Sequence, residues 1–249
     1  MKKSILCKIF LRSFFIHTTL NFRRMQNIGF TMAMIPAICQ WNLSQKDTQA
    51  MLSRHLQMFN THPYFSGPVL GSVIHLEEQV KGSEASDSIA VKQSLMGPYA
   101  AIGDTFFWGA LRPFAAIVAC ILAYNGYIIA PLAFLFLYTP AHVWVRLKGF
   151  LEGYRRGKQG IEFIRAMDLP SVALKVRWFS LIILAAGAAF LFAGQRVFLP
   201  FIISSELLLV MTVLAAVLLC LLLIKKMISQ FYILYGAAIL FLLISWKVF

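Results

Sequence analysis

The chain has 249 residues, of which 59% are hydrophobic and only 13% are charged, and its formal net charge is +13. Soluble domains carry about 25% charged residues, so this composition is typical of an integral membrane protein. A nucleic-acid-binding domain would collect its basic residues on a soluble face, with aromatic residues between them. Eight of the basic residues lie instead in one segment, 146–177, between hydrophobic stretches, which argues against nucleic acid as a partner.

Segment 1–59 is predicted to hold amphipathic, interfacial and surface helices. Lys8 and Arg12 are four residues apart and share one helix face among apolar neighbours, as in a basic helix that lies in the membrane interface. A helix packed on the rest of the protein is an equally good interpretation. Further on, Ser44 with Asp47 three residues later forms a weak capping box, which predicts the start of a surface helix.

Segment 60–112 contains two short apolar stretches, 63–76 and 95–111, joined by a hydrophilic loop. Each is shorter than a membrane span, and each carries a Gly-Pro step and a later glycine. Proline breaks helices, and irregular backbone at membrane depth is tolerated only where protein buries it or it lines a cavity. Paired, Gly/Pro-interrupted apolar segments point to a transporter binding site, so we expect two short re-entrant or broken hairpins here.

The uncharged run 113–145 is 33 residues long, and one helix of that length would measure about 50 Å, too long for a single span. Asn125-Gly126, Pro131 and Pro140 interrupt it, so we expect broken membrane helices.

Segment 178–249 contains three further apolar runs, at 178–195, 207–224 and 227–246. Each approaches the roughly 20 residues that cross the hydrocarbon core, which predicts three transmembrane helices. The chain as a whole is therefore expected to be an all-α, polytopic integral membrane protein. It would have two re-entrant or broken hydrophobic hairpins in its N-terminal half and about three to five membrane-spanning helices in its C-terminal half.

The basic residues also predict the orientation of the chain in the membrane. The basic segment 146–177 and the Lys225-Lys226 turn should both face the cytoplasm, because cytoplasmic loops collect Lys and Arg. The loop 196–200 has a single basic residue and should lie outside, as should Phe249.

Asp104 is the sharpest single candidate for function, because an ionisable group at membrane depth is costly. A plain alternative is that Asp104 caps a helix beginning at Thr105. Hydrogen-bonding side chains with an aromatic ring beside them suit a sugar, although a helix stop and turn is also a good interpretation of residues 60–63. The candidate substrate-binding residues are Asn60, Thr61, His62, Glu77, Glu78, Asp104 and Trp108.

Catalytic and metal-binding signatures are missing from the sequence. The histidines and acids near residues 55–78 do not form a His-Glu-x-x-His pattern, and no nucleophile elbow, P-loop or Rossmann fingerprint occurs. The four cysteines are far apart, with no Cys-x-x-Cys. We therefore expect no metal, no cofactor and no catalytic residue in this chain.

Three stretches carry a resemblance to a known family: "RSFFIHTTLNFRRMQNIGFTMAMIPAI" (12–38), "RHLQMFNTHPYFSGPVLGSVIHLEEQ" (54–79) and "LMGPYAAIGDTFFWGALRP" (95–113). In this order they resemble the IID membrane component of the mannose/fructose/sorbose family of the bacterial phosphoenolpyruvate-dependent sugar phosphotransferase system. Beyond residue 113 the resemblance depends on the hydropathy profile and on "LEGYRRGKQGIEFI" (151–164), and the last 70 residues diverge.

The resemblance implies a multi-pass protein of the bacterial cytoplasmic membrane that pairs with a IIC component, as a hetero-oligomer in the lipid bilayer, to carry a hexose inward. Soluble IIA and IIB components would phosphorylate the sugar, so this chain would be no enzyme on its own. Two alternatives stay open. The chain is a scaffold that braces IIC without touching sugar, or it is a membrane enzyme that uses His62, Glu77 and Glu78.

Overall fold

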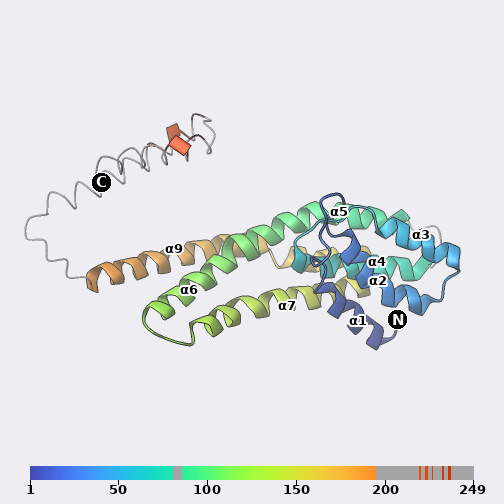
Figure 1. Ribbon diagram of the computed structural model, residues 1–249, viewed down its shortest axis with the longest axis horizontal. Coiled ribbons are helices and arrows are strands. Elements are labelled where there is room, and N and C mark those ends of the chain that lie inside the picture. The colour runs from blue at the N-terminus through green and yellow to red at the C-terminus, as the bar shows by residue number, and fades with distance from the viewer. Residues whose placement is uncertain are drawn as a thin grey trace, which may run out of the picture. The chain divides into compact units, whose positions relative to one another are not determined.

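The computed structural model describes residues 1–80 and 86–194, together with isolated residues further on. The chain divides into two compact units, Met1–Phe192 and Ala193–Phe249, and the fold described below is that of the first unit. Every long element in its described part is helical (Figure 1). The elements are α1 (Lys3–Ser13), α2 (Asn27–Trp41), α3 (Gln45–His55), η1 (Pro63–Phe65), α4 (Ser66–Val80), α5 (Ser86–Gly103), η2 (Asp104–Leu111), α6 (Arg112–Tyr124), α7 (Ala130–Arg156), η3 (Gly157–Gly160), α8 (Ile161–Ala166) and α9 (Leu169–Gly194).

Helix α3 begins where the capping box predicts. The Ser44 hydroxyl accepts a hydrogen bond from the Asp47 backbone N–H at 3.1 Å and donates one to the Asp47 carboxylate at 2.7 Å. This arrangement satisfies one of the backbone donors that the first turn of a helix leaves free.

The two short apolar stretches form one pair of helices rather than two separate hairpins. Helix α4 covers the first stretch, with Pro68 in its first turn, where the missing N–H would have no partner in any case. The second stretch lies inside a run that continues from α5 through η2 into α6 (Figure 1). Pro98 is accommodated within α5, as prolines often are in membrane helices. Asp104 consequently lies within a continuous helical run and does not cap the start of a helix.

The long uncharged run breaks at one of the expected places. Helix α6 ends at Tyr124, Gly126 adopts a positive φ of 78°, and α7 begins at Ala130 with Pro131 in its first turn. Pro140 lies inside α7 without ending it. The helix then runs on to Arg156, so the first part of the basic segment 146–177 is helical and continuous with the apolar run before it.

Helices α4 and α7 form the closest packing in the core. A Cβ atom added at Gly71 would clash with the Phe150 carbonyl oxygen and lie 2.9 Å from the Tyr154 nitrogen. One added at Gly153 would lie 2.5 Å from the Pro68 carbonyl oxygen. The two backbones can approach this closely only because these glycines lack side chains.

Helix α9 runs alongside α6 in the same direction. The Phe114 and Phe179 ring centroids are 5.8 Å apart, and further along a Cβ at Gly187 would lie 3.1 Å from the Ile121 side chain. Helix α9 also contains residues 178–194 of the first of the three apolar runs predicted to span the membrane in 178–249. The other two runs, 207–224 and 227–246, lie outside the described residues.

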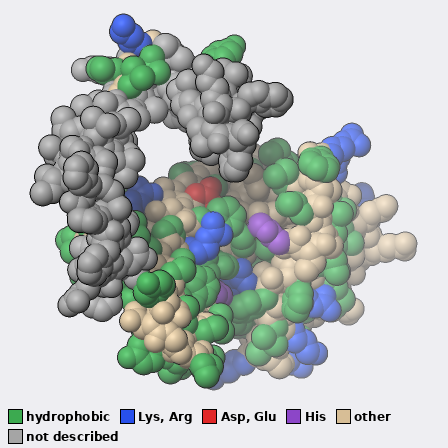
Figure 2. Space-filling model, turned by 60° about the vertical axis from the view of Figure 1, so that its left-hand side comes forward, with side chains coloured by type: hydrophobic (Ala, Val, Ile, Leu, Met, Phe, Trp, Pro, Cys, Tyr) green, Lys and Arg blue, Asp and Glu red, His purple; other side chains and the backbone are tan. Residues whose placement is uncertain are grey.

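Two described stretches, Asp87–Tyr124 and Ala130–Gly187, are long and apolar enough to cross a membrane by length and composition. Only 28% and 17% of their most apolar windows are buried, whereas the core helix of a soluble protein would be mostly buried. Figure 2 shows one face of the molecule, on which hydrophobic side chains cover wide areas between scattered Lys and Arg. Exposed apolar surface of this extent suits a lipid or protein environment.

Helix α1 packs on the rest of the protein through Ile9, which is fully buried. Lys8 and Arg12 stay on the exposed face, and the Arg12 guanidinium donates a hydrogen bond to the Met32 carbonyl at 3.0 Å. The helix is therefore packed on the rest of the protein with its basic face on the surface, and a position in the membrane interface stays a prediction.

We predict opposite effects from two Gly→Ala substitutions. Gly71→Ala forces α4 away from α7 and should lower the free energy of unfolding by about 1–3 kcal/mol. Gly97→Ala is the control, because no atom lies within 4 Å of the added Cβ and alanine favours a helix by about 1 kcal/mol over glycine. Thermal unfolding in detergent measures both, and equal midpoints would contradict the close packing of α4 and α7.

Candidate functional site

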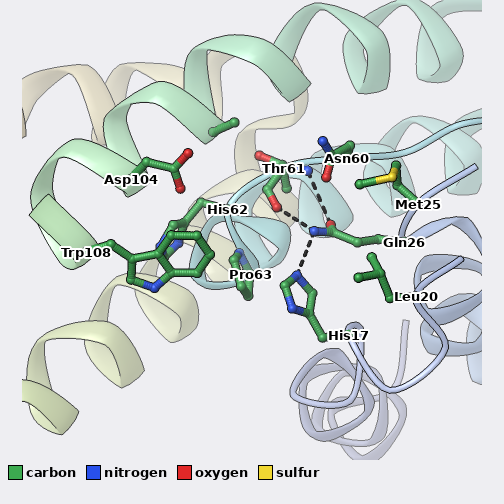
Figure 3. A pocket seen from close by; sticks show the side chains of 11 residues that line it. His17, Leu20, Met25, Gln26, Asn60, Thr61, His62, Pro63, Asp104 and Trp108 are labelled. Atoms are coloured by element: carbon green, nitrogen blue, oxygen red, sulfur yellow. Dashed lines mark hydrogen bonds between the residues drawn. The ribbon is translucent and has the colours of Figure 1, made fainter. Parts of the chain in front are cut away.

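A cavity of about 250 Å³ lies where the loop before η1 faces the junction of α5 and η2. Its volume is just below the roughly 300–1,000 Å³ of pockets for drug-sized ligands, so it suits a small ligand. Figure 3 shows the lining side chains arranged around it. The lining residues are His17, Leu20, Met25, Gln26, Asn60, Thr61, His62, Pro63, Ala100, Asp104 and Trp108.

Gln26 fixes one wall of the cavity. Its side-chain amide donates to the Thr61 carbonyl at 2.6 Å, and its side-chain oxygen accepts from the Thr61 N–H at 3.3 Å. The same amide nitrogen lies 2.8 Å from Nε2 of His17 (Figure 3). Gln26 thus satisfies both backbone hydrogen-bonding groups of Thr61, as a neighbouring β-strand would. The Thr61 hydroxyl is buried and has no hydrogen-bond partner in the described chain.

His62 is 2% exposed and lies between aromatic rings. Its ring centroid is 4.7 Å from that of Trp108, and its plane stacks on Phe107. Nδ1 accepts a hydrogen bond from the Tyr64 N–H at 3.3 Å, so the proton of the neutral ring belongs on Nε2. Nε2 has no partner among the described residues, which leaves a buried donor at the cavity wall.

Burial is the main reason why the His62 pKa falls from 6.5 to about 3, and electrostatic repulsion from His17, Arg146 and His142 lowers it further. The ring is therefore neutral at physiological pH. Helix α5 comes close to this ring at Gly103, where an added Cβ would clash with the His62 side chain.

Asp104 and Trp108 reach the cavity from η2, which is a π-helix. Such insertions in α-helices often occur at functional sites. The Arg177 side chain, from α9, donates to the Gly109 carbonyl at 3.0 Å and to the Thr105 carbonyl at 3.3 Å, so it binds carbonyls of this wider turn. The Asp104 carboxylate is exposed and accepts no hydrogen bond from the described part of the chain.

Arg146 fixes the opposite end of the same loop. The sequence predicts that it is one of the basic residues facing the cytoplasm, but its side chain is only 3% exposed. Its guanidinium donates to the Pro63 carbonyl at 2.8 Å and lies over the rings of Phe14 and Tyr64, at 4.4 and 5.5 Å from their centroids. The loop that carries Asn60, Thr61 and His62 is thus held at both ends.

Glu77 does not line the cavity, because it is fully buried in an ion cluster between α3, α4 and α5. The Arg54 guanidinium donates to both of its oxygens, at 3.1 and 2.5 Å, His55 Nε2 lies 2.8 Å from one of them, and the Ser88 hydroxyl donates at 2.6 Å. Burial alone would raise the Glu77 pKa, but the bonds from His55, Arg54 and Ser88 outweigh it and lower the pKa to about 2. Glu77 is therefore ionised and has several hydrogen bonds.

Glu78 also lies away from the cavity. It accepts a hydrogen bond from the Tyr154 hydroxyl at 2.6 Å and pairs with the Met1 amino group at 2.9 Å. Five of the seven candidate residues thus surround one cavity, and the two glutamates lie in contacts between helices.

Residues 1–249 match the family described as the "PTS system mannose/fructose/sorbose family IID component". The chain belongs to this family.

One relative is the mannose-specific EIID component of Escherichia coli K12, which is 37% identical over 153 residues. That match covers 60% of this chain and 54% of the relative, so the matched region spans about half of the relative's length. Among solved structures, one described only as a membrane protein has a TM-score of 0.71 at 26% identity and covers 97% of this chain and 95% of its own. Another, a complex of the mannose transporter ManYZ with microcin E492, has a TM-score of 0.59 at 27% identity with the same coverage. Family membership and these neighbours identify a membrane protein.

Some residues of the site were missed from the sequence. His17 and Gln26 fall within the first of the stretches that carry the IID family resemblance, so a signal was present there, but nothing in the local pattern linked them to Thr61. Neither Arg177 nor the π-helix could be recognised from the sequence. A wide helical turn changes the hydrophobic pattern too little to be detected.

We predict that His62 makes stability depend on pH. Its folded-state pKa is below 6.5, so its contribution is complete above pH 6.5 and is lost as the pH falls toward 3. The slope from this one group is at most about 1.4 kcal/mol per pH unit. His62→Gln should flatten the pH dependence of the unfolding midpoint between about pH 7 and about pH 5.

His55, whose pKa burial also lowers despite its bond to Glu77, remains in both proteins and leaves a residual slope. Identical slopes for the wild-type and His62→Gln proteins would show that His62 is not buried as a neutral ring.

Proposed function

We propose that this chain is the IID subunit of a sugar permease, and that its cavity forms part of the path for a hexose. It would work with a IIC partner as a multi-pass hetero-oligomer of the bacterial cytoplasmic membrane, and soluble IIA and IIB components would phosphorylate the sugar. The ManYZ transporter among its structural neighbours supports a membrane partner of this kind. The observation that carries the sugar-contact part is a small cavity whose wall holds unpaired polar groups beside an exposed indole.

The chemistry of the cavity suits a polyhydroxylated ring. The His62 ring offers a donor, the Thr61 hydroxyl is both a donor and an acceptor, and the Asp104 carboxylate accepts hydrogen bonds. The face of Trp108 complements the apolar side of a sugar ring. A bound sugar would satisfy polar atoms that have no partner in the described part of the chain, and unsatisfied buried groups are costly.

The geometry of the described residues does not favour the alternative of a membrane enzyme. A membrane enzyme using His62, Glu77 and Glu78 would need these side chains to converge, but His62 lies at the cavity and Glu77 is enclosed in its ion cluster. Phosphoryl transfer is therefore proposed to belong to the soluble components.

Asp104→Asn tests the sugar-contact part of the proposal. The amide removes a charged acceptor, and a hydrogen bond to a charged group contributes about 1.5–3 kcal/mol, so the apparent KM for hexose uptake should rise on the order of tenfold or more. Uptake by cells that express the full transporter measures this change at equal membrane abundance of the variant.

Asp87→Asn is the matched control on the same helix, because its carboxylate pairs with Lys158 at the surface, 2.9 Å away. It should leave uptake unchanged, since exposed ion pairs contribute little. Normal uptake in Asp104→Asn, His62→Gln and Thr61→Val together would reject direct contact and favour a scaffold that braces the IIC partner.

A further inference from the structure

A second, larger hollow of about 490 Å³ lies between α1 and the last turns of α7, away from the sugar cavity. On α1 its lining residues recur at spacings of three and four, so they form one stripe along the helix. Its apolar floor consists of Leu6, Phe10, Leu147, Phe150 and Leu151. Lys3, Cys7, Met1, Tyr154 and Arg155 complete the lining.

The groove has a direction, from a basic end to an apolar end. Met1 and Tyr154 are joined by a hydrogen bond of 2.9 Å at one end, and the Phe10 and Phe150 ring centroids are 6.0 Å apart further along. Lys3 and Arg155 therefore lie at the same end, and the apolar floor extends away from them.

The two basic side chains at that end are available to a ligand. Lys3 and Arg155 are exposed and form no ion pair with any described residue, unlike the neighbouring Arg156, whose guanidinium pairs with Glu152 at 2.9 Å. The nearby carboxylate of Glu78 is already engaged by the Tyr154 hydroxyl and the Met1 amino group. The basic end therefore favours an anion.

The position of the groove along α7 matches the depth of a lipid headgroup. Helix α7 begins in apolar sequence and ends with Arg155 and Arg156, and the positive-inside rule assigns that end to the cytoplasmic surface. The basic end then lies at headgroup level, and the apolar floor runs from it toward the apolar part of α7. The two basic residues of α7 beside the floor do not oppose this placement, because Lys148 pairs with Glu152 and Arg146 is buried. Basic pockets between helices on the cytoplasmic side are suited to anionic lipid headgroups.

We propose that this groove binds one anionic glycerophospholipid of the cytoplasmic leaflet, with its phosphate between Lys3 and Arg155 and one acyl chain along the apolar floor. The lipid holds α1 against α7. Helix α7 also carries Arg146, which holds the loop at the 250 Å³ cavity. The lipid site and that cavity are therefore connected through α7. The proposal rests on the membrane location of the chain and on the orientation that the positive-inside rule predicts, and it does not depend on sugar contact.

Native mass spectrometry of the full chain in detergent tests the site, with phosphatidylglycerol and phosphatidylcholine of identical acyl chains as probes. Each basic residue near an anionic surface contributes a factor of about five in affinity, so the two together should make the protein retain phosphatidylglycerol about 25-fold more tightly. Lys3→Gln with Arg155→Gln should abolish this preference and leave phosphatidylcholine binding unchanged. Cys7→Trp, which fills the groove, should reduce binding of both lipids.

Lys8→Gln with Arg165→Gln is the matched control, because both residues are exposed and basic but lie outside the groove lining. Equal losses of phosphatidylglycerol in the two double variants would overturn the proposal, as would equal retention of the two lipids by the wild-type chain. A dimer that Cys7→Trp abolishes, with no lipid retained, would also overturn it and assign the groove to a second copy.

A measurement on the unsubstituted protein avoids any effect of the variants on folding. Phosphatidylglycerol with a photoreactive group at the end of one acyl chain should label peptides that carry the apolar floor, from α1 and from α7. Labelling that spreads evenly over the exposed apolar surfaces of α6 and α9 would overturn the proposal.

Discussion

The close approach of α4 and α7 is the constraint on which the rest of the first unit depends. Gly71 and Gly153 let the two backbones meet without intervening side chains, and a contact of this kind has few alternative arrangements because packed interiors do not deform continuously. It determines where Arg146 lies relative to η1, and Arg146 in turn holds the Pro63 carbonyl. The position of His62 is therefore determined by backbone packing several turns away, as well as by its own neighbours.

Charge is buried in this unit where it joins helices. Glu77 lies among Arg54, His55 and Ser88, and the Lys92 ammonium donates to the His55 carbonyl at 2.9 Å while lying 4.7 Å from the Phe30 ring centroid. Removing one partner from such a cluster leaves an uncompensated charge, which costs more than the cluster contributes as a whole. The cluster therefore specifies how α3, α4 and α5 meet. The 250 Å³ cavity, by contrast, is lined by neutral donors and one exposed carboxylate.

The sequence predicted the helical class, the cap at Ser44 and the break at Asn125-Gly126, because each depends on local chemistry. The family resemblance and the two apolar stretches also indicated five residues that line one cavity in the structure: Asn60, Thr61, His62, Asp104 and Trp108. It could not separate these from Glu77, since an acid that binds a ligand and one that joins helices look alike until their partners are known. Arg146 and Arg177 were hidden for a similar reason: the positive-inside rule counts charges, whereas the two side chains bind particular carbonyls far away in sequence.

The π-helix η2 changes which face of the following helix, α6, is turned toward its neighbours. A π turn is an α-helix with one additional residue, and each residue of an α-helix turns the chain by about 100°. The face of α6 that meets α7 is thus rotated relative to α5 by the wider turns between Asp104 and Leu111. A homologue lacking one residue of η2 would have a smooth helix there, but α6 would present a different face to its neighbour. In this family a one-residue gap at η2 would mark a change of helix packing, even where the surrounding sequence is the same.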